Sequence, residues 1–448
     1  MIHRLAGCWF VFSVAVVALW AATTTPATAV ASTLELYGFG PRAIGLAGAV
    51  EASSNGALTT WDNPALLGSL RHPQGGLIGT ALLPAMQIAQ ARGHAQWPAA
   101  LPGNALLGSL AVASPVGGIF AERVGVGLAL HIPMNVPTSI ASRDASQPQV
   151  PLYEGLASRL VVAIGVGWQV TDWLAVGATG QLLARLDGGG EFRLSALDRR
   201  FTDQRLNVDL ISRVTATLGA VLTPHRRLRL ATVWRDEASV RYRIPLTVSV
   251  AEVGDIRMDV AGVGLWSPMS LALSAQWTLA PRWRLMASAR WERWSTIPAL
   301  APAISLTIDD ATLARQSGVP ASVIARMQTL PVALAASDIV QPRVGIEGVL
   351  RPWLQLRGGL GFRPSPLPRA TGSANYLDAN SILAGVGASF SVPDPDRVDA
   401  DALAIDIGLG WTHLLRRTAG KQDAADPVGA VSLEGDAFRV SIGLRHAL

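Results

Sequence analysis

Several segments of this chain alternate strictly between apolar and polar residues, and this alternation constrains the fold more than any other feature. In the segment 173–185, one face of an extended chain is apolar, and the residues on it are Leu174, Val176, Ala178, Leu182 and Ala184. The opposite face is polar or small. The same alternation recurs in three later segments, 353–363, 403–412 and 437–446. A period of two residues predicts β-strands with one apolar face.

Composition indicates what those apolar faces meet. Half of the residues are hydrophobic (50%), only 15% are charged, and the mean hydropathy is +0.32. After residue 30, no window holds the roughly 18 uncharged apolar residues that a membrane-spanning helix requires. A transmembrane strand needs only about 10 residues, of which alternate ones face lipid. The sequence therefore predicts a transmembrane β-barrel rather than a soluble all-β protein, which should carry more surface charge.

The connections between these segments support a membrane barrel. Short and long joins alternate, as periplasmic turns and external loops do in outer-membrane barrels. The short joins are 171–172, 223–226, 280–282 and 351–352, and the long ones are 135–156, 187–207, 239–267, 295–338, 364–379 and 415–436. We predict an all-β fold, an antiparallel barrel of about fourteen strands, an even number that returns the C-terminus to the periplasmic side. The predicted strands are 75–89, 105–114, 122–134, 158–170, 173–186, 209–222, 227–237, 268–279, 283–294, 339–350, 353–363, 380–390, 402–414 and 436–446.

Two residue types mark positions along these strands. Tryptophans near strand ends are typical of an interfacial girdle, and they are Trp168, Trp173, Trp234, Trp277, Trp283, Trp353 and Trp411. Glycines are frequent in the third and fourth strands, at Gly125, Gly127, Gly165 and Gly167. We predict that strand pairing is weakest at these glycines, which makes them candidates for a lateral opening.

The first 31 residues predict a cleaved Sec-type signal peptide. His3 and Arg4 form a positive start, the stretch 9–22 is apolar, and small residues allow cleavage after Ala29 or Ala31. The only cysteine, Cys8, lies in a sequence that resembles a lipoprotein processing box, but it precedes the apolar stretch, so we interpret the box as a coincidence. The mature chain then has no cysteine for a disulfide or a thiolate metal site. We expect export to the outer membrane and insertion by the barrel assembly machinery as a monomer.

Two regions do not show strand alternation. Residues 32–74 precede the predicted barrel (75–448) and are rich in Gly, Ala, Ser and Asn, and they have room only in the lumen or in the periplasm. The longest predicted external loop, 295–338, contains a segment at 310–329 with helical spacing. A helix there would carry an apolar face, formed by Val323, Ile324 and Met327.

Residues 38–68 contain a glycine-rich segment, G-x-G-x-R-A followed by G-A, that leads to Asn63-Pro64-Ala65. This segment resembles the N-terminal hatch of the outer-membrane transporters for long-chain fatty acids and aromatic hydrocarbons, the FadL and toluene-transport family. Later segments, 283–295 and 357–390, are also similar to that family. The resemblance implies a hatch inside the barrel lumen, with gate residues at Gly45, Gly48, Asn63, Pro64 and Ala65.

The resemblance also implies a mechanism and a class of partner. A hydrophobic small molecule would bind to external loops, at the face of Val323, Ile324 and Met327, enter the lumen, and leave sideways into the lipid of the outer membrane after the hatch moves. Lateral exit avoids exposing methylene groups to water, at about 0.8 kcal/mol each. Transport would be passive. The same hatch signature occurs in related barrels, so a structural or secretion-system barrel is the alternative function.

Charged residues on inferred inward faces are the other candidates. They are Arg290, Glu292, Arg343, Glu347, Arg357, Arg363 and Arg439. Arg343 or Arg357 could hold the carboxylate of a fatty acid. The competing interpretation, which we prefer, is that these residues form a salt-bridge network that fills the lumen.

Other function classes receive less support. The histidines are scattered without metal-ligand spacing, and the chain has neither a Gly-x-Ser-x-Gly motif nor a phosphate-binding loop. We therefore predict no enzyme activity, no cofactor and no metal site. The net charge of +5 is small for 448 residues and does not favour a nucleic-acid partner. A lumen closed by a hatch disfavours a water-filled porin.

Overall fold

The computed structural model describes most of the chain after the predicted signal peptide. The described residues are 38–90, 101–118, 123–134, 147–154, 160–195, 200–250, 254–299, 303–309, 327–328, 334–372, 374–392, 403–421 and 428–447. The helices are α2 (Gly40–Gly45), α3 (Thr59–Asp62), η1 (Pro64–Ser69), α4 (Pro151–Glu154) and η5 (Trp294–Thr296). No helix in these ranges is long and apolar enough to cross a membrane. The signal peptide predicted at 1–31 lies outside the described residues.

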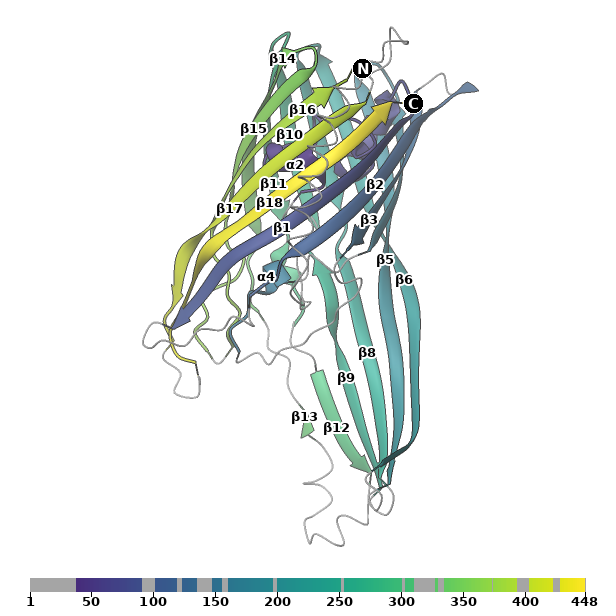
Figure 1. Cartoon of the computed structure of the whole chain (residues 1–448), viewed down its shortest axis with the longest axis vertical. Coiled ribbons are helices and arrows are strands. Elements are labelled where there is room, and N and C mark those ends of the chain that lie inside the picture. The colour runs from purple at the N-terminus through teal and green to yellow at the C-terminus, as the bar shows by residue number, and fades with distance from the viewer. Residues whose placement is uncertain are drawn as a thin grey trace, which may run out of the picture.

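Eighteen strands account for most of the remaining described chain (Figure 1). They are β1 (Gln74–Gln90), β2 (Ala105–Val116), β3 (Val124–Pro133), β4 (Val161–Gln169), β5 (Leu174–Ser195), β6 (Arg200–His225), β7 (Leu228–Arg235), β8 (Ala238–Val250), β9 (Gly254–Ser267), β10 (Ser270–Ala280), β11 (Trp283–Glu292), β12 (Ala303–Asp309), β13 (Met327–Gln328), β14 (Ile339–Arg351), β15 (Leu354–Arg363), β16 (Ser381–Ser391), β17 (Ala404–Ala419) and β18 (Val431–Ala447).

Fourteen of these strands form a closed antiparallel barrel. Going round the wall, β1 to β7 are followed by β10, β11 and then β14 to β18. The barrel closes where β1 pairs with β18, from Gln74 opposite Ala447 to Gln90 opposite Val431. Closure leaves no unpaired strand edge in the wall, as a membrane barrel requires. The predicted fold class is confirmed, and each predicted strand overlaps one strand of the barrel.

Short turns gather at one end of the barrel, where the C-terminus also lies (Figure 1). They join β4 to β5, β6 to β7, β10 to β11 and β14 to β15. This is the periplasmic end by the rule for outer-membrane barrels. The long connections lie at the opposite, external end. Trp168, Trp173, Trp277, Trp283 and Trp353 are exposed at the periplasmic end and form the predicted girdle there, whereas Trp234 lies near the external end of β7 and Trp411 midway along β17.

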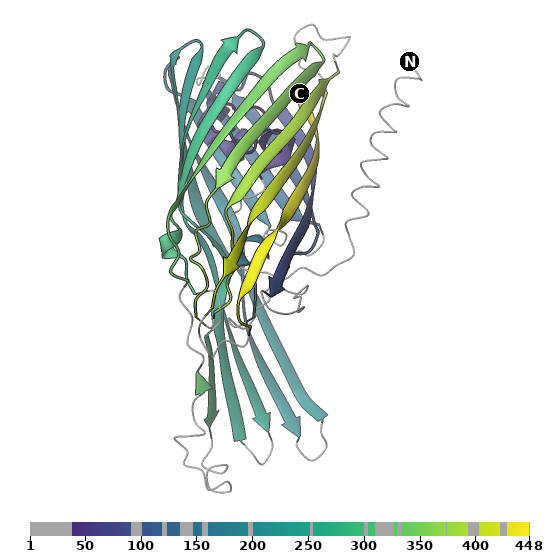
Figure 2. The ribbon, with the colours of Figure 1, turned by 90° about the vertical axis from the view of Figure 1, so that its left-hand side faces the viewer.

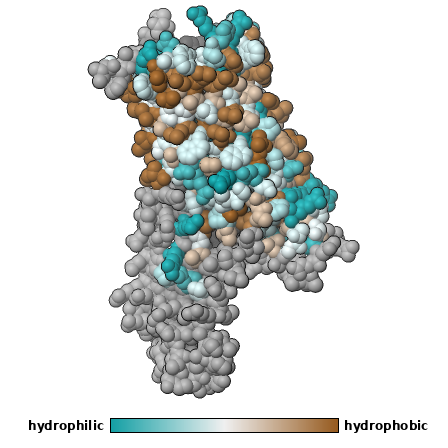
Figure 3. All heavy atoms as spheres, turned by 180° about the vertical axis from the view of Figure 1, so that it is seen from behind, coloured by the Kyte–Doolittle hydropathy of each residue, from teal (hydrophilic) through white to brown (hydrophobic). Residues whose placement is uncertain are grey.

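The outer wall of the barrel is apolar, as the alternation predicts. Exposed large hydrophobic side chains project from successive strands, among them Leu110, Val126, Ile164, Leu218, Leu273, Val344 and Leu360. Figure 3 shows apolar residues spread over the face of the barrel wall that is seen from behind. Residues of this kind, exposed in a band, are stable in contact with lipid rather than with water.

Beyond the external end, a sheet continues the wall where the sequence predicted loops (Figures 1 and 2). The prediction of loops at 187–207 and 239–267 is wrong, because β5 and β6 run through the first range and β8 and β9 through the second. β5 pairs in parallel with β8, and β9 pairs with β12. Outside the membrane, both faces of a strand can carry polar residues, so the apolar period that identifies a transmembrane strand is lost there.

The helix predicted at 310–329 lies mostly outside the described residues, as do Val323 and Ile324. The exception is β13, where Met327 pairs with Leu306 in an extended conformation instead of the predicted helix.

An apolar cluster fills the external mouth of the barrel. It joins side chains from the external parts of β1, β14, β17 and β18 to Leu152 and Tyr153 of α4. Two buried tryptophans, Trp266 and Trp294, lie in the same cluster with ring centroids 5.4 Å apart. The lumen is therefore covered on its external side by packed apolar side chains.

Candidate functional site

Residues 38–70, which contain α2, α3 and η1, lie inside the barrel, and we call them the N-terminal plug. Its helices contact the inner faces of the wall on opposite sides: α2 lies against β15 to β18, and η1 lies against β2 to β6. Most of its residues are buried, including Ile44, Leu46, Asn63 and Leu67. The structure thus places this segment in the lumen, one of the two locations that the sequence left open.

Glycines on the inner wall form the seat of the plug. A Cβ at Gly177 of β5 would lie 2.4 Å from the carbonyl carbon of Pro64, and a Cβ at Gly219 of β6 would lie 2.1 Å from Oδ1 of Asn63. On the other side, a Cβ at Gly385 of β16 would lie 2.1 Å from the carbonyl oxygen of Ile44. No side chain larger than hydrogen fits at these positions, because the plug backbone lies against Gly177 and Gly385 and the buried Asn63 side chain lies against Gly219.

The glycines of β3 and β4 belong to the same seat. Gly125 and Gly167 face the main chain of η1. The ladder between β3 and β4 runs without interruption from Val124 opposite Trp168 to His131 opposite Val161. These glycines make room for the plug and keep their ladder pairing, and weaker pairing at this place stays a prediction.

Asn63-Pro64-Ala65 forms a capped turn inside the plug. Asn63 is completely buried and extended, and its Oδ1 accepts a hydrogen bond from the amide of Ala65 at 3.1 Å. Its Nδ2 donates to the carbonyl oxygen of Glu51 at 2.8 Å. Pro64 begins η1, where its missing N–H costs nothing. The Asn63 amide thus joins the two halves of the plug.

The structure brings the two predicted glycines of the plug next to the two predicted arginines of the wall. Gly48 has a positive φ of 86°, and a Cβ there would lie 2.7 Å from Nη1 of Arg343. A Cβ at Gly45 would lie 3.0 Å from Cγ of Arg357. Each glycine therefore gives an arginine of the wall close access to the plug backbone.

Ion pairs attach the plug to the wall at separate points. Arg42 donates to Glu347 of β14 with an Nη2–Oε2 distance of 2.8 Å. Glu51 accepts from Arg290 of β11 with an Nη2–Oε1 distance of 2.7 Å, and both side chains are buried. Buried pairs of this kind are strongly destabilised when one partner is removed, because an uncompensated charge remains.

A third charged contact involves the end of α3. Arg235 of β7 donates to the carbonyl oxygens of Trp61 and Asp62 at 2.7 and 3.1 Å. The Asp62 carboxylate accepts a hydrogen bond from Ser54 at 2.6 Å. Burial raises the pKa of Asp62 to about 6, although the Ser54 hydrogen bond and nearby arginines act in the opposite direction.

The two predicted substrate-binding arginines have different surroundings. Arg357 lies 3.1 Å from Asp406 and 3.7 Å from Glu347, so it belongs to a salt-bridge network. Arg343 donates to the side chain of Gln341 at 2.8 Å and to the carbonyl oxygen of Gly48 at 3.4 Å. Among the described residues, no carboxylate lies within salt-bridge distance of Arg343. The preferred interpretation as a lumen-filling network therefore describes Arg357 but not Arg343.

Sequence reasoning did not single out the plug residues that carry charge. Arg42 stood in the quoted glycine-rich motif, and Glu51 and Asp62 are the only acidic residues between 38 and 70. A carboxylate that is buried in the lumen needs a basic partner. The two acids of this segment could therefore have been singled out in the sequence as residues that bind arginines of the wall.

Among the cavities formed by the described residues, three lie at different levels between the external connections and the periplasmic end. An external groove of about 300 Å³ is lined mainly by apolar side chains, with Leu334, Leu367 and Tyr376 at its base. A middle cavity of about 20 Å³ lies between the plug and Arg235, Arg290 and Arg343. A lower cavity of about 50 Å³ lies between the plug and the periplasmic ends of the wall strands.

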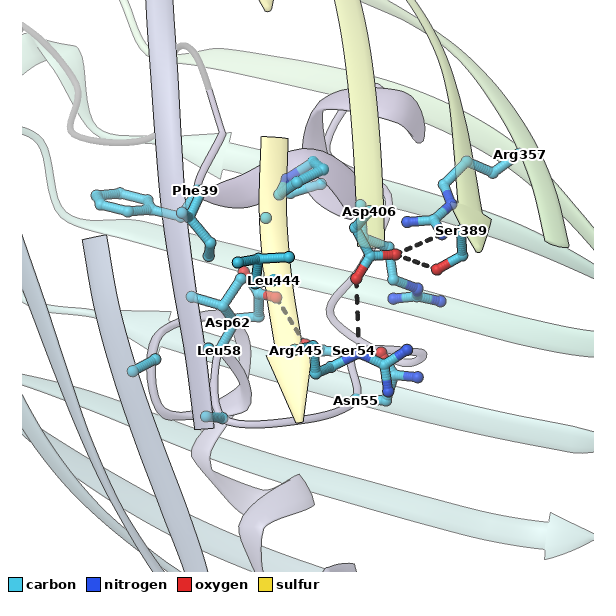
Figure 4. Close-up of a pocket in the computed structure, with 18 of the residues that line it drawn as sticks. Phe39, Ser54, Asn55, Leu58, Asp62, Arg357, Ser389, Asp406, Leu444 and Arg445 are labelled. Carbon is cyan, nitrogen blue, oxygen red and sulfur yellow. Dashed lines mark hydrogen bonds and ion pairs between the residues drawn. The ribbon is translucent and has the colours of Figure 1, made fainter. Parts of the chain in front are cut away.

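The lower cavity has a mainly apolar side, on which Asp62 also lies, and a charged side (Figure 4). Phe39 and Leu58 of the plug lie on the mainly apolar side. Ile78 and Ala111 of the wall also line the cavity. On the charged side, the carboxylate of Asp406 binds Ser389, Arg357 and Arg445. Within the described ranges, no group of three or more potential metal ligands is present.

A closed fourteen-strand barrel with an apolar outer wall and a segment packed in its lumen defines a plugged barrel of the outer membrane. The chain belongs to the family of outer membrane transport proteins described as OMPP1/FadL/TodX, whose family model matches residues 18–439. It is therefore an outer-membrane β-barrel, and members of its family are transporters or channels rather than enzymes.

Individual relatives are distant in sequence. Alkane uptake protein A of Marinobacter nauticus is 22% identical over 320 residues, which cover 69% of this chain and 66% of that protein, slightly less than two thirds of its length. A FadL homologue of Pseudomonas aeruginosa has a TM-score of 0.57 and 13% identity, with 95% of this chain and 99% of that chain covered. The toluene transporter TodX of P. putida has a TM-score of 0.59 and 13% identity, with 92% and 99% covered. These two structures share the fold, and the matches do not favour the alternative of a secretion-system barrel.

Proposed function

We propose that this protein is a passive transporter that carries hydrophobic compounds across the outer membrane, with the N-terminal plug as its gate. The observation that carries the proposal is the attachment of the plug. It lies in the lumen, and among the described residues hydrogen bonds, ion pairs and packing attach it to the wall, all of which can break and re-form. The protein acts without a cofactor and catalyses no reaction, and the substrate moves down its own concentration gradient.

Capture of the substrate takes place at the external groove. The groove is large enough for part of an alkyl chain or an aromatic ring, and its base continues into the apolar cluster at the barrel mouth. The contribution of Val323, Ile324 and Met327 to capture stays a prediction from the sequence, because Val323 and Ile324 lie outside the described residues. A charge placed in the groove by Ala370→Asp should lower uptake, and an unchanged rate would show that capture occurs elsewhere.

Inside the barrel, Arg343 is the candidate group for a substrate with a carboxylate. It lines the middle cavity and contacts the plug at Gly48, so a bound carboxylate would lie directly beside the gate. A charge-assisted hydrogen bond from arginine is roughly twice as strong as a neutral one. Fatty acids would use this contact, and alkanes or toluene, the cargo for which the relatives are named, would pass without it.

Release occurs sideways into the membrane. The apolar side of the lower cavity lies against β1, β2 and β18, where Ile78, Ala111 and Gly443 line the wall. All neighbouring pairs of the fourteen wall strands are hydrogen-bonded to each other, so an opening requires local separation of strands. Lateral release keeps each methylene out of water, which is favourable by about 0.8 kcal/mol for each one.

The test is uptake of labelled oleate, and separately of a labelled alkane and toluene, by cells that lack their own outer-membrane fatty acid transporter. Asn63→Ala removes the amide that joins the two halves of the plug and should abolish uptake. Asn380→Ala is the matched control, because it removes an exposed external amide whose Oδ1 accepts from Ser365. Equal amounts of folded monomeric barrel are verified from gel mobility before and after heating. If the cells took up none of the three compounds, the proposal would be refuted.

A further inference from the structure

The middle and lower cavities share part of their lining. Phe39, Ala43 and Asp62 of the plug contribute to both. The wall residues of the two cavities, by contrast, come from opposite ends of their strands. Arg235 is the last residue of β7 at its external end, whereas Gly76 and Arg445 lie at the periplasmic ends of β1 and β18. The three shared residues therefore form the partition between the two sides of the plug.

Two of the three partition residues are fixed or small. Ala43 lies in the middle of α2 and is buried, and its methyl group cannot move without the helix. Asp62 ends α3, its carboxylate is held by Ser54, and its carbonyl oxygen accepts from Arg235. Phe39 supplies the largest side chain of the partition and precedes α2, so it can move while the helix stays in place.

The backbone around Phe39 is built from two glycines in the left-handed region. Gly38 has a φ of +73° and Gly40 a φ of +81°, conformations that L side chains rarely adopt. The ring of Phe39 packs on Trp61, with centroids 4.0 Å apart, and on His131, with centroids 4.6 Å apart. The phenyl group makes no hydrogen bond, so its displacement breaks only packing contacts.

We infer that Phe39 is the residue that separates the middle cavity from the lower one and sets the size of the solute that can pass the plug. Rotation of the chain at Gly38 and Gly40 moves the ring off Trp61 and joins the two cavities into one path. The inference rests on the proposed function, because it specifies which side chain of the plug opens. Only the first residue of α2, Gly40, takes part in this rotation, and the rest of α2 and η1 stay in their glycine seats.

The test uses purified protein in liposomes and measures the entry of uncharged sugars of increasing size. Phe39→Ala should admit larger sugars, and faster, than the unchanged protein does. Phe438→Ala is the matched control, because Phe438 is a phenylalanine exposed on the outer wall. Sugar entry does not depend on recognition of a hydrophobic substrate, so it reports on the partition alone.

A second variant leaves the ring in place. Gly38→Ala adds a methyl group in ordinary contact with Ala43, 3.5 Å away, but strains the left-handed backbone of the closed state. Rotation of the chain at residue 38 relieves this strain. The substitution should therefore increase the population in which the two cavities are joined roughly fivefold. Faster sugar entry through both variants supports the inference even if no hydrophobic compound is transported. Sugar entry equal to that of the unchanged protein and of Phe438→Ala, with folded barrels in every case, overturns it whether or not oleate uptake is intact.

Discussion

The substitution Gly177→Ala should displace the plug while leaving the barrel wall intact. The added Cβ would lie 2.4 Å from the carbonyl carbon of Pro64 and 2.5 Å from the amide nitrogen of Ala65. Carbon atoms in ordinary contact are about 3.5–4.0 Å apart, so the plug backbone has to retreat by roughly 1 Å. Gly177 itself keeps its place in the ladder between Gly167 and Gly219.

The size of the effect follows from the nature of the colliding atoms. Overpacking a filled site costs typically about 1–3 kcal/mol, and the upper part of this range applies because backbone atoms cannot rotate away. A loss of about 3 kcal/mol from the seated plug changes the ratio of seated to displaced plug by more than roughly a hundredfold. The barrel should therefore fold normally but allow small solutes to pass through its lumen.

Gly180→Ala is the control for this substitution. Gly180 lies on the same strand but is exposed on the outer face, and a Cβ there makes only an ordinary contact, 3.6 Å from Cγ1 of Val214. The measurements are solute entry into liposomes and protease cleavage within residues 38–70. If liposomes with Gly177→Ala and with Gly180→Ala admitted solutes at the same rate, and both variants resisted protease equally, the description of the inner glycines as a seat for the plug would be refuted.

Three more substitutions test the charged contacts. Burial raises the pKa of Asp62 to about 6 from 3.8, so the seated plug binds a proton more readily than the displaced plug. The free energy of seating should therefore become more favourable as the pH falls from 6 to 4, by on the order of 3 kcal/mol. Asp62→Asn should remove this dependence of liposome permeability on pH. Glu347→Gln should lower the stability of the seated plug by about 3–5 kcal/mol, measured by protease sensitivity, whereas the same change at Glu434, whose pair is exposed, should cost about 1 kcal/mol or less. Arg343→Ala should reduce oleate uptake but not toluene uptake, and equal oleate uptake in Arg343→Ala and in the exposed control Arg416→Ala would exclude a carboxylate contact.

The membrane explains why the barrel was predictable from sequence. A wall strand has lipid on one side over its whole membrane-spanning length, so apolar residues recur at every second position, as in 173–185. The same rule explains the failure at β8 and β9. These strands pair beyond the external end, where water replaces lipid, and charged residues such as Arg243 and Asp259 are compatible with strand pairing there.

The plug was only partly predictable. Asn63-Pro64-Ala65 is contiguous, and a resemblance to a known family identified it. The partners of the plug lie far away in sequence: 305 residues separate Arg42 from Glu347, and 239 separate Glu51 from Arg290. No local pattern encodes such pairs, because barrel closure and strand register decide which wall residues face the plug. The inner glycines were visible in the sequence, but their role became clear only from what lies opposite them.

The contacts of the plug divide into two kinds, and the division bears on how a substrate could open the gate. The glycine seat fixes where the plug fits, through backbone contacts that a ligand cannot reach. The charged contacts of Glu51 with Arg290 and of Arg235 with α3 border the middle cavity, which is the side that a substrate from outside reaches first. Glu51 also accepts the Asn63 hydrogen bond through its carbonyl oxygen, so disturbing Glu51 disturbs the link between the two halves of the plug. We therefore expect the charged contacts on the external side to determine when the plug moves, and the glycine seat to determine that it returns to the same place.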